Sequence, residues 1–346
     1  KKGDGMKEIR ENARKLMKGF CRVCRVCDGK ACAGEVPGMG GVGTGSSFVN
    51  NVEGLRAVTL NMKLLHDVKE PDTSVRLLGM DLSMPVMAAP IGGVSFNMGG
   101  GIEESEYVDA VLGGCREAGV IGCTGDGAPQ FVIDAGLEGI ARQEGHGIPF
   151  IKPWEGGELD EKIDRAFEAG STVIGMDVDA AGVTTLKKMG RPVSPKPPGR
   201  LKLIVDKVHK KGGRFILKGI MDPDEAKIAA DIGVDAVVVS NHGGRALDHT
   251  PSTAQALEAV ARAVKPGITV LADGGVRDGV DVFKMISLGA DCVLIGRPFC
   301  IAAVGGLKQG VVQYLETVRE QFSQAMVLTA SPDTASIGEA ACSRPF

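Results

Sequence analysis

The stretch that decides the fold reads Ala236-Val237-Val238-Val239-Ser240-Asn241-His242-Gly243-Gly244-Arg245. Its first part is a short apolar run of mostly β-branched residues, which is typical of a strand buried in a parallel sheet. A histidine and an arginine follow, so they lie just past the carboxyl end of that strand. In an α/β barrel the loops at this end meet over one shared mouth, where the chemistry takes place. The stretch therefore predicts a barrel strand that carries a proton-exchanging imidazole, His242, and a carboxylate-binding guanidinium, Arg245.

Seven more apolar runs surround this one along the chain and alternate with amphipathic, helix-like segments. The predicted strands cover residues 86–89, 120–123, 150–152, 173–178, 215–217, 236–239, 269–272 and 292–295. Eight strands alternating with helices favour a (β/α)₈ TIM barrel, in the α/β class, over an open doubly wound sheet. We predict one barrel over residues 51–346, a lid loop over residues 189–200, a closing helix over 309–328 and a loosely ordered tail over 331–346. A helical and cysteine-glycine extension over residues 1–50 precedes the barrel.

Composition excludes several classes of function. The 346 residues carry a net charge of −3, which gives no overall attraction to nucleic acid or to an anionic membrane. No apolar run reaches the roughly 20 residues of a membrane span. Residues 1–20 are basic and polar and lack the apolar core of a signal peptide, so the sequence predicts a cytoplasmic protein. In such a protein the nine cysteines indicate thiols or metal ligands rather than disulfides.

Four of these cysteines follow a predicted helix over residues 7–20 and are themselves followed by a glycine-rich stretch over residues 34–45. Cys21, Cys24, Cys27 and Cys32 have the spacing C-x₂-C-x₂-C-x₄-C. Two-residue gaps let successive thiolates turn toward one centre, as they do in iron–sulfur and zinc sites. The fourth gap is one residue longer than in the bacterial ferredoxin run. The pattern predicts an iron–sulfur cluster or a zinc site, and reduced free thiols are the alternative.

Two other strand ends carry features of anion-binding sites. Asp273-Gly274-Gly275-Val276-Arg277 follows the seventh strand, and Gly296-Arg297-Pro298 follows the eighth. The loops after these two strands commonly hold a phosphate in such barrels, and each adds an arginine here; solvated arginines are the alternative.

Three further charged residues follow predicted strands. Lys218 at the end of the fifth strand can form a Schiff base or hold a negative charge. Asp179 after the fourth strand is placed to accept a proton from the ring of His242. Asp248 is interpreted as a helix-entry residue without a chemical role.

Together these motifs resemble the FMN-dependent α-hydroxy acid dehydrogenase and oxidase family, which includes glycolate oxidase and lactate oxidase. The resemblance extends from about Asn51 to Ser336 and rests on the three motifs in this order, including Leu247-Asp248 and Ile295. It implies a (β/α)₈ barrel with FMN at its mouth and the phosphate of FMN in the last two loops. It also implies a homo-oligomer and a small 2-hydroxy acid substrate.

The resemblance assigns roles residue by residue. His242 is the base that takes a proton from the 2-hydroxy acid as a hydride equivalent reaches flavin N5. Arg245 binds the substrate carboxylate, Asp179 pairs with His242, and Lys218 stabilises the reduced flavin near N1. The flavin ring, the ribityl chain and the phosphate are assigned to Ala89, Pro90, Ile91, Gly92, Thr124, Ser240, Gly243, Asp273, Gly275, Arg277, Gly296 and Arg297.

Several positions depart from the family pattern. Lys152 stands where the family has a glutamine by the flavin, and Asp177 where it has a threonine. We expect Lys152 to act as a second cation there, which would raise the reduction potential. Trp154 replaces a tyrosine that touches the substrate, and Leu186 falls where a second carboxylate-binding arginine is usual. Lys187, Lys188 and Arg191 are the candidates to replace that arginine. The cysteine-glycine segment occupies the place of the usual N-terminal tyrosine.

The sequence thus predicts an FMN-dependent oxidoreductase that converts a small 2-hydroxy acid to the 2-oxo acid, with electrons leaving through a carrier protein. Three alternatives stay open. One is an FMN-dependent reductase or isomerase of a different small acid, prompted by Lys152, Trp154 and Leu186. The second is an aldolase that uses Lys218 as a Schiff-base nucleophile. The third is a flavin- or cysteine-based redox sensor without turnover.

Overall fold

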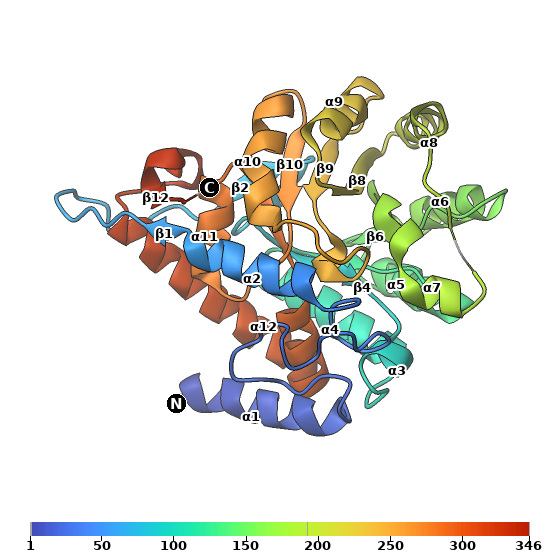
Figure 1. Ribbon diagram of the computed structural model, residues 1–346, viewed down its shortest axis with the longest axis horizontal. Helices are drawn as coiled ribbons and strands as arrows, with labels where there is room; N and C mark the ends of the chain where they lie inside the picture. Colours follow the sequence, from blue (N-terminus) through green and yellow to red (C-terminus); the bar gives the residue numbers. More distant parts are fainter. Residues whose placement is uncertain (1, 192, 346) are drawn as a thin grey trace.

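The computed structural model describes residues 2–191 and 193–345, and their centre is a closed barrel of parallel strands (Figure 1). The strands of the barrel are β4 (Val86–Ile91), β5 (Ile121–Thr124), β6 (Ile148–Ile151), β7 (Val173–Asp177), β8 (Arg214–Ile220), β9 (Ala236–Val239), β10 (Thr269–Ala272) and β11 (Cys292–Ile295). Each strand pairs in parallel with the next along the chain, and β11 pairs with β4 to close the ring. The predicted TIM barrel is confirmed, and the bounds of the last three strands are the predicted ones.

Helices surround the barrel and connect its strands. They are α4 (Glu104–Glu117), α5 (Gln130–Arg142), α6 (Glu158–Glu168), α8 (Pro198–Lys210), α9 (Pro223–Asp231), α10 (Thr253–Val264), α11 (Gly279–Ser287) and α12 (Arg297–Leu328). Capping residues set where they begin. Asp222 accepts hydrogen bonds from two backbone N–H groups of the first turn of α9, and Ser252 forms a capping box with Gln255 at the start of α10. Leu307, with φ 48°, kinks α12.

The strands bury both of their faces, which explains why they read as continuous apolar runs. In β9, Ala236 and Val238 belong to the cluster that fills the barrel, together with Phe150 and Leu271. Val237 and Val239 belong to the larger cluster between the barrel and its helices. The period of two along each strand thus places alternate side chains in two different cores.

The N-terminal residues cover one end of the barrel. Helix α1 (Lys2–Leu16) packs on α12, and α2 (Ser46–Ala57) packs beside α10 and η2 (His242–Gly244). The cysteine-glycine segment, residues 17–45, joins these two helices as a chain of turns below the barrel in Figure 1. Residue 50, where the sequence analysis divides the chain, lies inside α2.

The tail is ordered as far as residue 345, so the prediction of a loose end is wrong. β12 (Cys342–Ser343) pairs antiparallel with β1 (Thr59–Leu60), and the buried side chains of Ile337 and Cys342 join the main core. Phe346 lies outside the described residues. Short elements complete the fold: the hairpin of β2 (Val75–Leu77) and β3 (Met80–Leu82), and the helices α3 (Val94–Asn97) and α7 (Thr184–Lys188). No described helix is both long enough and apolar enough to cross a membrane.

We expect Phe150→Ala to lower the free energy of unfolding by about 3–5 kcal/mol, because the ring is fully buried inside the barrel and its loss leaves a cavity. Phe131, 47% exposed on α5, is the control, and Phe131→Ala should change that free energy by about 0.5 kcal/mol or less. Urea unfolding measures both. Equal losses in the two variants would contradict this account of the core.

Candidate active site

A cavity of about 1140 Å³, measured to its open mouth, lies at the carboxyl ends of the barrel strands. Most of the predicted site residues line it: Ala89, Pro90, Ile91, Gly92, Lys152, Lys218, His242, Gly243, Arg245, Asp273, Gly275, Arg277, Gly296 and Arg297. Of the others, Asp177, Asp179, Ser240 and Thr124 lie behind this lining. The structure thus brings together residues that the sequence separates by two hundred positions.

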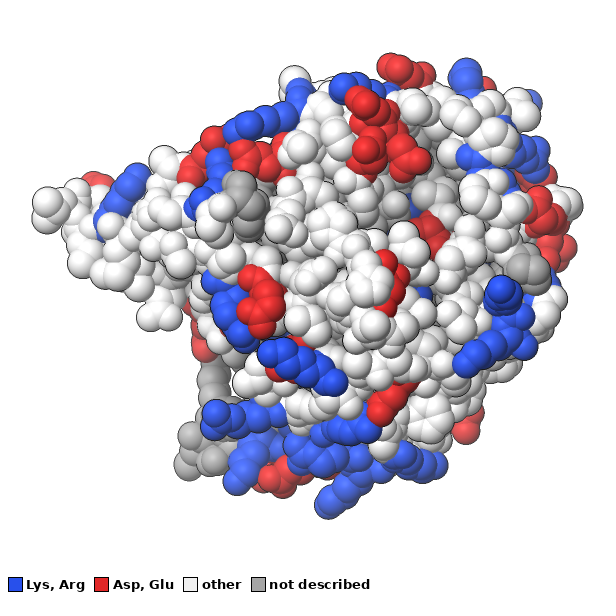
Figure 2. All heavy atoms as spheres, in the orientation of Figure 1, with Lys and Arg blue, Asp and Glu red and all other residues white. Residues whose placement is uncertain are grey.

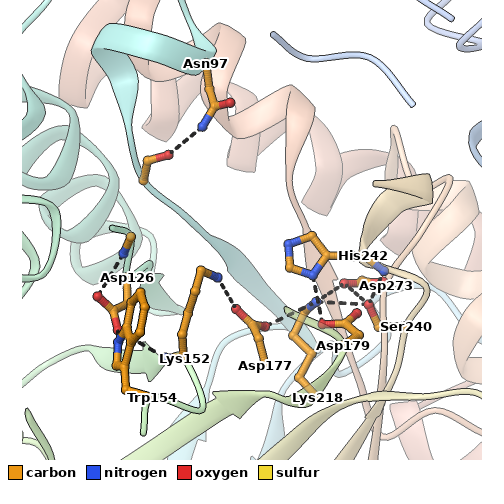
Figure 3. A network of polar contacts seen from close by, with 12 residues as sticks. Asn97, Asp126, Lys152, Trp154, Asp177, Asp179, Lys218, Ser240, His242 and Asp273 are labelled. Atoms are coloured by element: carbon orange, nitrogen blue, oxygen red, sulfur yellow. Dashed lines mark hydrogen bonds and ion pairs between the residues drawn. The ribbon is translucent and has the colours of Figure 1, made fainter. Parts of the chain in front are cut away.

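His242 is held by a carboxylate from a neighbouring strand end (Figure 3). Its Nδ1 lies 2.9 Å from Oδ1 of Asp179, which follows β7 in η1 (Val178–Gly182). Because a carboxylate accepts hydrogen bonds, Nδ1 carries the proton and Nε2 is left with a free lone pair. The backbone N–H of His242 donates to Ser240 Oγ at 3.0 Å, and His242 itself has a φ of 59°. A backbone conformation this rare persists only where the surroundings impose it, which is common at functional sites.

Lys218 occupies a buried position among carboxylates. Its Nζ lies 3.3 Å from Asp273 Oδ2 and 3.5 Å from Asp177 Oδ1, and it donates to Ser240 Oγ at 3.0 Å. Burial alone would lower the pKa of Lys218, but Asp273, Asp177 and Asp179 outweigh burial and raise it above its ordinary value. The side chain is therefore an ammonium ion. This charge conflicts with the aldolase alternative, which needs a neutral amine as nucleophile.

Two departures from the family pattern form one ion pair. Lys152 Nζ lies 3.3 Å from Asp177 Oδ2, and both side chains are buried. Burial alone would raise the pKa of Asp177, but the charges of Lys152 and Lys218 lower it to about 2. Lys152, in place of the family's glutamine, is thus paired with Asp177, which stands in place of the family's threonine. Asp177, Asp179 and His242 also offer ligand atoms within 4.8 Å of one another, but the lysine ammonium groups already neutralise this acidic cluster.

Trp154 does not line the cavity. Its Nε1 donates to Asp126 Oδ2 at 2.5 Å, and its ring packs between Lys162 and Arg191, whose cationic groups lie 4.4 and 4.7 Å from the ring centroid. The only polar hydrogen of the indole is therefore used within the wall of the site, and the predicted contact of Trp154 with substrate has no support in this geometry. Asp126 itself lines the cavity and also accepts from Lys162 Nζ at 2.9 Å.

Arg277 and Arg297, which follow β10 and β11, make their part of the cavity positively charged. Arg297 is half-buried, and its guanidinium lies 3.7 Å from the centroid of the Phe48 ring. The pKa of Arg297 is lowered to about 10, first by burial and then by the positive charges of Arg277 and Arg245. A bound phosphate would offset this repulsion. The predicted phosphate end of the site therefore fits the charge that FMN carries.

Asp273 supplies a second test of the fit. It lines the cavity, and its Oδ1 is buried without a hydrogen-bond partner among the described residues. A buried carboxylate oxygen without a donor is costly, and a ribityl hydroxyl is a donor of the right kind. The adjacent Gly275 has a φ of 83°, and a Cβ there would come within 2.3 Å of Asn51 O. This loop can thus follow its path only with glycine at that position.

Arg245 connects the cavity to the cysteine-glycine segment. Its Nη1 donates to Gly38 O at 2.6 Å and to Gly40 O at 3.0 Å, and its Nη2 donates to Asn97 Oδ1 at 3.2 Å. Met39 of this segment lines the cavity. The segment therefore forms a wall of the site and holds Arg245 in place, with part of the guanidinium left to face a substrate.

The interpretation of Asp248 as a helix-entry residue is wrong, because Ser252 caps α10. Asp248 instead accepts hydrogen bonds from Thr44 N, Thr44 Oγ1 and Ser46 Oγ, at 2.5, 2.8 and 2.7 Å. It fixes the end of the cysteine-glycine segment where α2 begins.

Sequence reasoning missed part of the cavity wall. Asp126 follows β5 between two glycines, a pattern that resembles the strand-end motifs used for the other loops and could have identified it. The apolar part of the wall comes from Phe96, Val183, Leu186 and Met189, and from Leu294 inside the barrel. Of these only Leu186 was singled out from the sequence. Isolated apolar residues in loops carry no signal that separates them from core residues.

We expect Lys152 and Asp177 to depend on each other energetically. Lys152→Gln or Asp177→Thr alone should lower the free energy of unfolding by about 3–5 kcal/mol, because each leaves a buried charge poorly compensated. The double variant should lose about 1–3 kcal/mol less than the sum of the two. Urea unfolding of all four proteins measures the coupling. Lys202 and Asp206, an exposed pair 2.8 Å apart, are the control and should couple by less than about 1 kcal/mol. Strict additivity at Lys152 and Asp177 would contradict the compensation.

We expect Asp281, which contacts Arg277, to make the free energy of unfolding depend on pH. Its Oδ2 accepts the backbone N–H of Arg277 at 2.9 Å, and burial, followed by the charge of Asp278, raises its pKa from 3.8 to about 6. The folded protein thus binds this proton more tightly than the unfolded chain does, so stability from this group is lost as the pH rises through about 4 to 6.

Asp281→Asn keeps an acceptor for Arg277 and carries no charge to bury. Relative to this variant, the parent protein should lose about 1–3 kcal/mol of unfolding free energy between pH 4 and pH 7. Denaturation at both pH values measures the difference. Parallel pH profiles for the two proteins would refute the assignment.

The comparisons with known proteins agree with this geometry. The family model described as FMN-dependent dehydrogenase matches residues 38–212 and 200–344. An L-lactate dehydrogenase of Caulobacter vibrioides is 53% identical over 127 residues, which are 37% of this chain and 33% of that protein. An L-lactate dehydrogenase of Yersinia pestis is 50% identical over 125 residues, 36% of this chain and 33% of that protein. The chain thus spans about a third of the length of these curated relatives.

Solved structures of mandelate oxidase are similar over nearly the whole chain. One superposes with a TM-score of 0.79 at 25% identity and covers 98% of this chain and 97% of the other. A second, with benzoyl-formic acid, gives a TM-score of 0.78 at 26% identity over the same shares of the two chains. The family model alone covers most of the sequence. The chain therefore belongs to the family of FMN-dependent dehydrogenases.

Proposed function

We propose that this protein oxidises a small 2-hydroxy acid to the 2-oxo acid with FMN as the electron acceptor. The observation that carries the proposal is the pair of His242 and Asp179 in a cavity that Arg245, Arg277 and Arg297 also line. One cavity thus holds a candidate base, a candidate carboxylate-binding group and two candidate phosphate ligands. The similarity to L-lactate dehydrogenases and to mandelate oxidase supports the same substrate class.

FMN, when bound, accepts a hydride equivalent at N5. His242 takes the hydroxyl proton on Nε2, since Nδ1 is committed to Asp179. The negative charge of Asp179 then stabilises the imidazolium and keeps the ring in one orientation. Arg245 binds the substrate carboxylate and places the 2-hydroxyl against the base. Its contacts with Gly38, Gly40 and Asn97 hold the guanidinium rigid for this purpose.

The remaining polar residues hold the cofactor. Lys218 would stabilise the negative charge of the reduced flavin, and its three carboxylate neighbours keep it charged. Asp273 would accept from the ribityl chain, and Arg277 and Arg297 would bind the phosphate. Ser240 donates to Asp273 Oδ2 at 2.9 Å and accepts from Lys218, so it fixes the relative positions of these two side chains.

The apolar wall indicates the kind of acid. Val183, Leu186 and Met189 line the cavity, and Leu186 stands where the family has its second carboxylate-binding arginine. With Arg245 as the carboxylate-binding group, this wall fits a monocarboxylic 2-hydroxy acid with an apolar side chain better than a dicarboxylic one. A second carboxylate placed against Val183, Leu186 and Met189 would face carbon atoms, which is unfavourable for a charge.

The test is the flavin spectrum of protein purified without oxygen, recorded before and after adding L-lactate, glycolate or mandelate. We expect bound flavin to bleach with at least one of these acids. His242→Ala should keep the flavin but slow the bleaching by roughly 10²–10⁴-fold, because the base is gone. His209, which pairs with Asp235 at 2.8 Å on the outside of the barrel, is the matched control, and His209→Ala should bleach at the parental rate.

Two results would reject the proposal. The first is flavin that stays oxidised with every acid, which would favour the reductase or isomerase alternative. The second is unchanged bleaching in His242→Ala, which would remove the base. If the protein is a redox sensor without turnover, the flavin should stay oxidised with every acid, and the sensing function should not depend on His242.

A further inference from the structure

The cysteine-glycine segment is held in place through its backbone, which leaves its thiols available. Arg10 Nη2 donates to Cys24 O at 2.5 Å, and Arg14 Nη2 donates to Val23 O at 2.9 Å, both from α1. From the barrel, Arg277 donates to Cys27 O through Nε and Nη2, at 3.2 and 3.0 Å. All four thiols of the motif are free and partly buried. The proposed FMN function assigns no role to any of them.

The four thiols are near enough to interact electrostatically. Cys27, Cys32 and Cys24 each act on the partly buried Cys21 thiol. The backbone N–H of Val23 donates to Cys21 Sγ at 3.4 Å. Sequence spacing and geometry therefore agree that the four thiols share one site, and an N–H bond to sulfur is a feature that tunes iron–sulfur centres.

The sulfurs are not arranged as the ligands of one preformed zinc site. Four sulfurs around one zinc ion, each about 2.3 Å from it, lie roughly 3.8 Å apart. No three of these four sulfurs lie within 4.8 Å of one another. Among the described residues, only Asp177, Asp179 and His242 have three potential ligand atoms that close together. A cubane cluster, whose iron and sulfide atoms stand between the ligands, holds the cysteine sulfurs farther apart.

The surroundings carry the charge that such a cluster requires. Residues 5–35 contain eight Lys or Arg and four Asp or Glu, whereas the whole chain has a net charge of −3. Figure 2 shows Lys and Arg side chains gathered at the end of the molecule that α1 forms. A cluster with four thiolate ligands is an anion, so this local excess of positive charge stabilises it.

We propose that Cys21, Cys24, Cys27 and Cys32 bind a [4Fe–4S] cluster next to the phosphate end of the flavin site. The first three cysteines form the compact run and the fourth closes the site from five residues farther on. The cluster would be connected to the cavity through Arg277, which contacts Cys27 O and lines the cavity, and through Arg297, which donates to Met39 O at 2.8 Å.

The role of this cluster rests on the proposed function. Oxidation of one 2-hydroxy acid releases two electrons and two protons. The cluster takes the electrons from the reduced flavin one at a time and passes each to an external one-electron carrier protein before the next arrives. Two carrier molecules are reduced for each acid oxidised, and the two protons leave to water.

The site is tested first without substrate. In protein purified without oxygen we expect about four iron and four acid-labile sulfide per chain, and no stoichiometric zinc. Cys24→Ser and Cys27→Ser should each lose most of the iron and sulfide while keeping their flavin and their circular dichroism spectrum. Cys342→Ala, a buried cysteine in β12 outside the segment, is the control and should keep both. One zinc per chain without sulfide, or neither metal, would overturn the proposal.

The electron route is tested separately. After anaerobic addition of an acid that bleaches the flavin, the parent protein should develop the electron paramagnetic resonance signal of a reduced cluster. Cys24→Ser should bleach but show no such signal. A loaded cluster that stays oxidised while the flavin is bleached would refute the route. If no acid bleaches the flavin, dithionite still reveals the cluster, so failure of the proposed function is distinguishable from failure of this site.

Discussion

Compensation of buried charge at the barrel mouth is the constraint on which the rest of the structure depends. Lys218 stands on β8 among carboxylates from β7 and from the end of β10, with Ser240 from the end of β9 between them. An ammonium ion out of contact with water is tolerated only when such partners surround it. The four consecutive strands β7, β8, β9 and β10 must therefore keep their relative register. That requirement also fixes Asp179 and thereby the imidazole that it orients.

The same constraint explains how the barrel mouth accommodates two residues that depart from the family pattern. A lysine in place of glutamine would add an uncompensated charge beside Lys218, yet Asp177 removes that excess from the neighbouring strand. The two changes make sense only together. Lys152 is therefore a cation paired with Asp177, and its effect on the reduction potential stays a prediction.

Much of the fold was predictable because it is local in sequence. The run at residues 236–239 and its counterparts mark strands by their own composition, and capping residues such as Asp222 mark helix starts. The strand-end motifs identified His242, Lys218, Arg277 and Arg297, because a barrel brings all carboxyl ends together. What failed depends on distant partners. Nothing near Trp154 shows that Asp126 takes its N–H, and nothing near Asp248 shows that Thr44 and Ser46 bind it.

The contact of Arg277 with Cys27 joins residues 250 positions apart. Synthesis proceeds from the N-terminus, so the cysteines are made long before the loop whose Arg277 binds Cys27. A long closure of this kind also forms late in folding. The contact between this segment and the barrel mouth can therefore form only after β10 and the loop that follows it have been made.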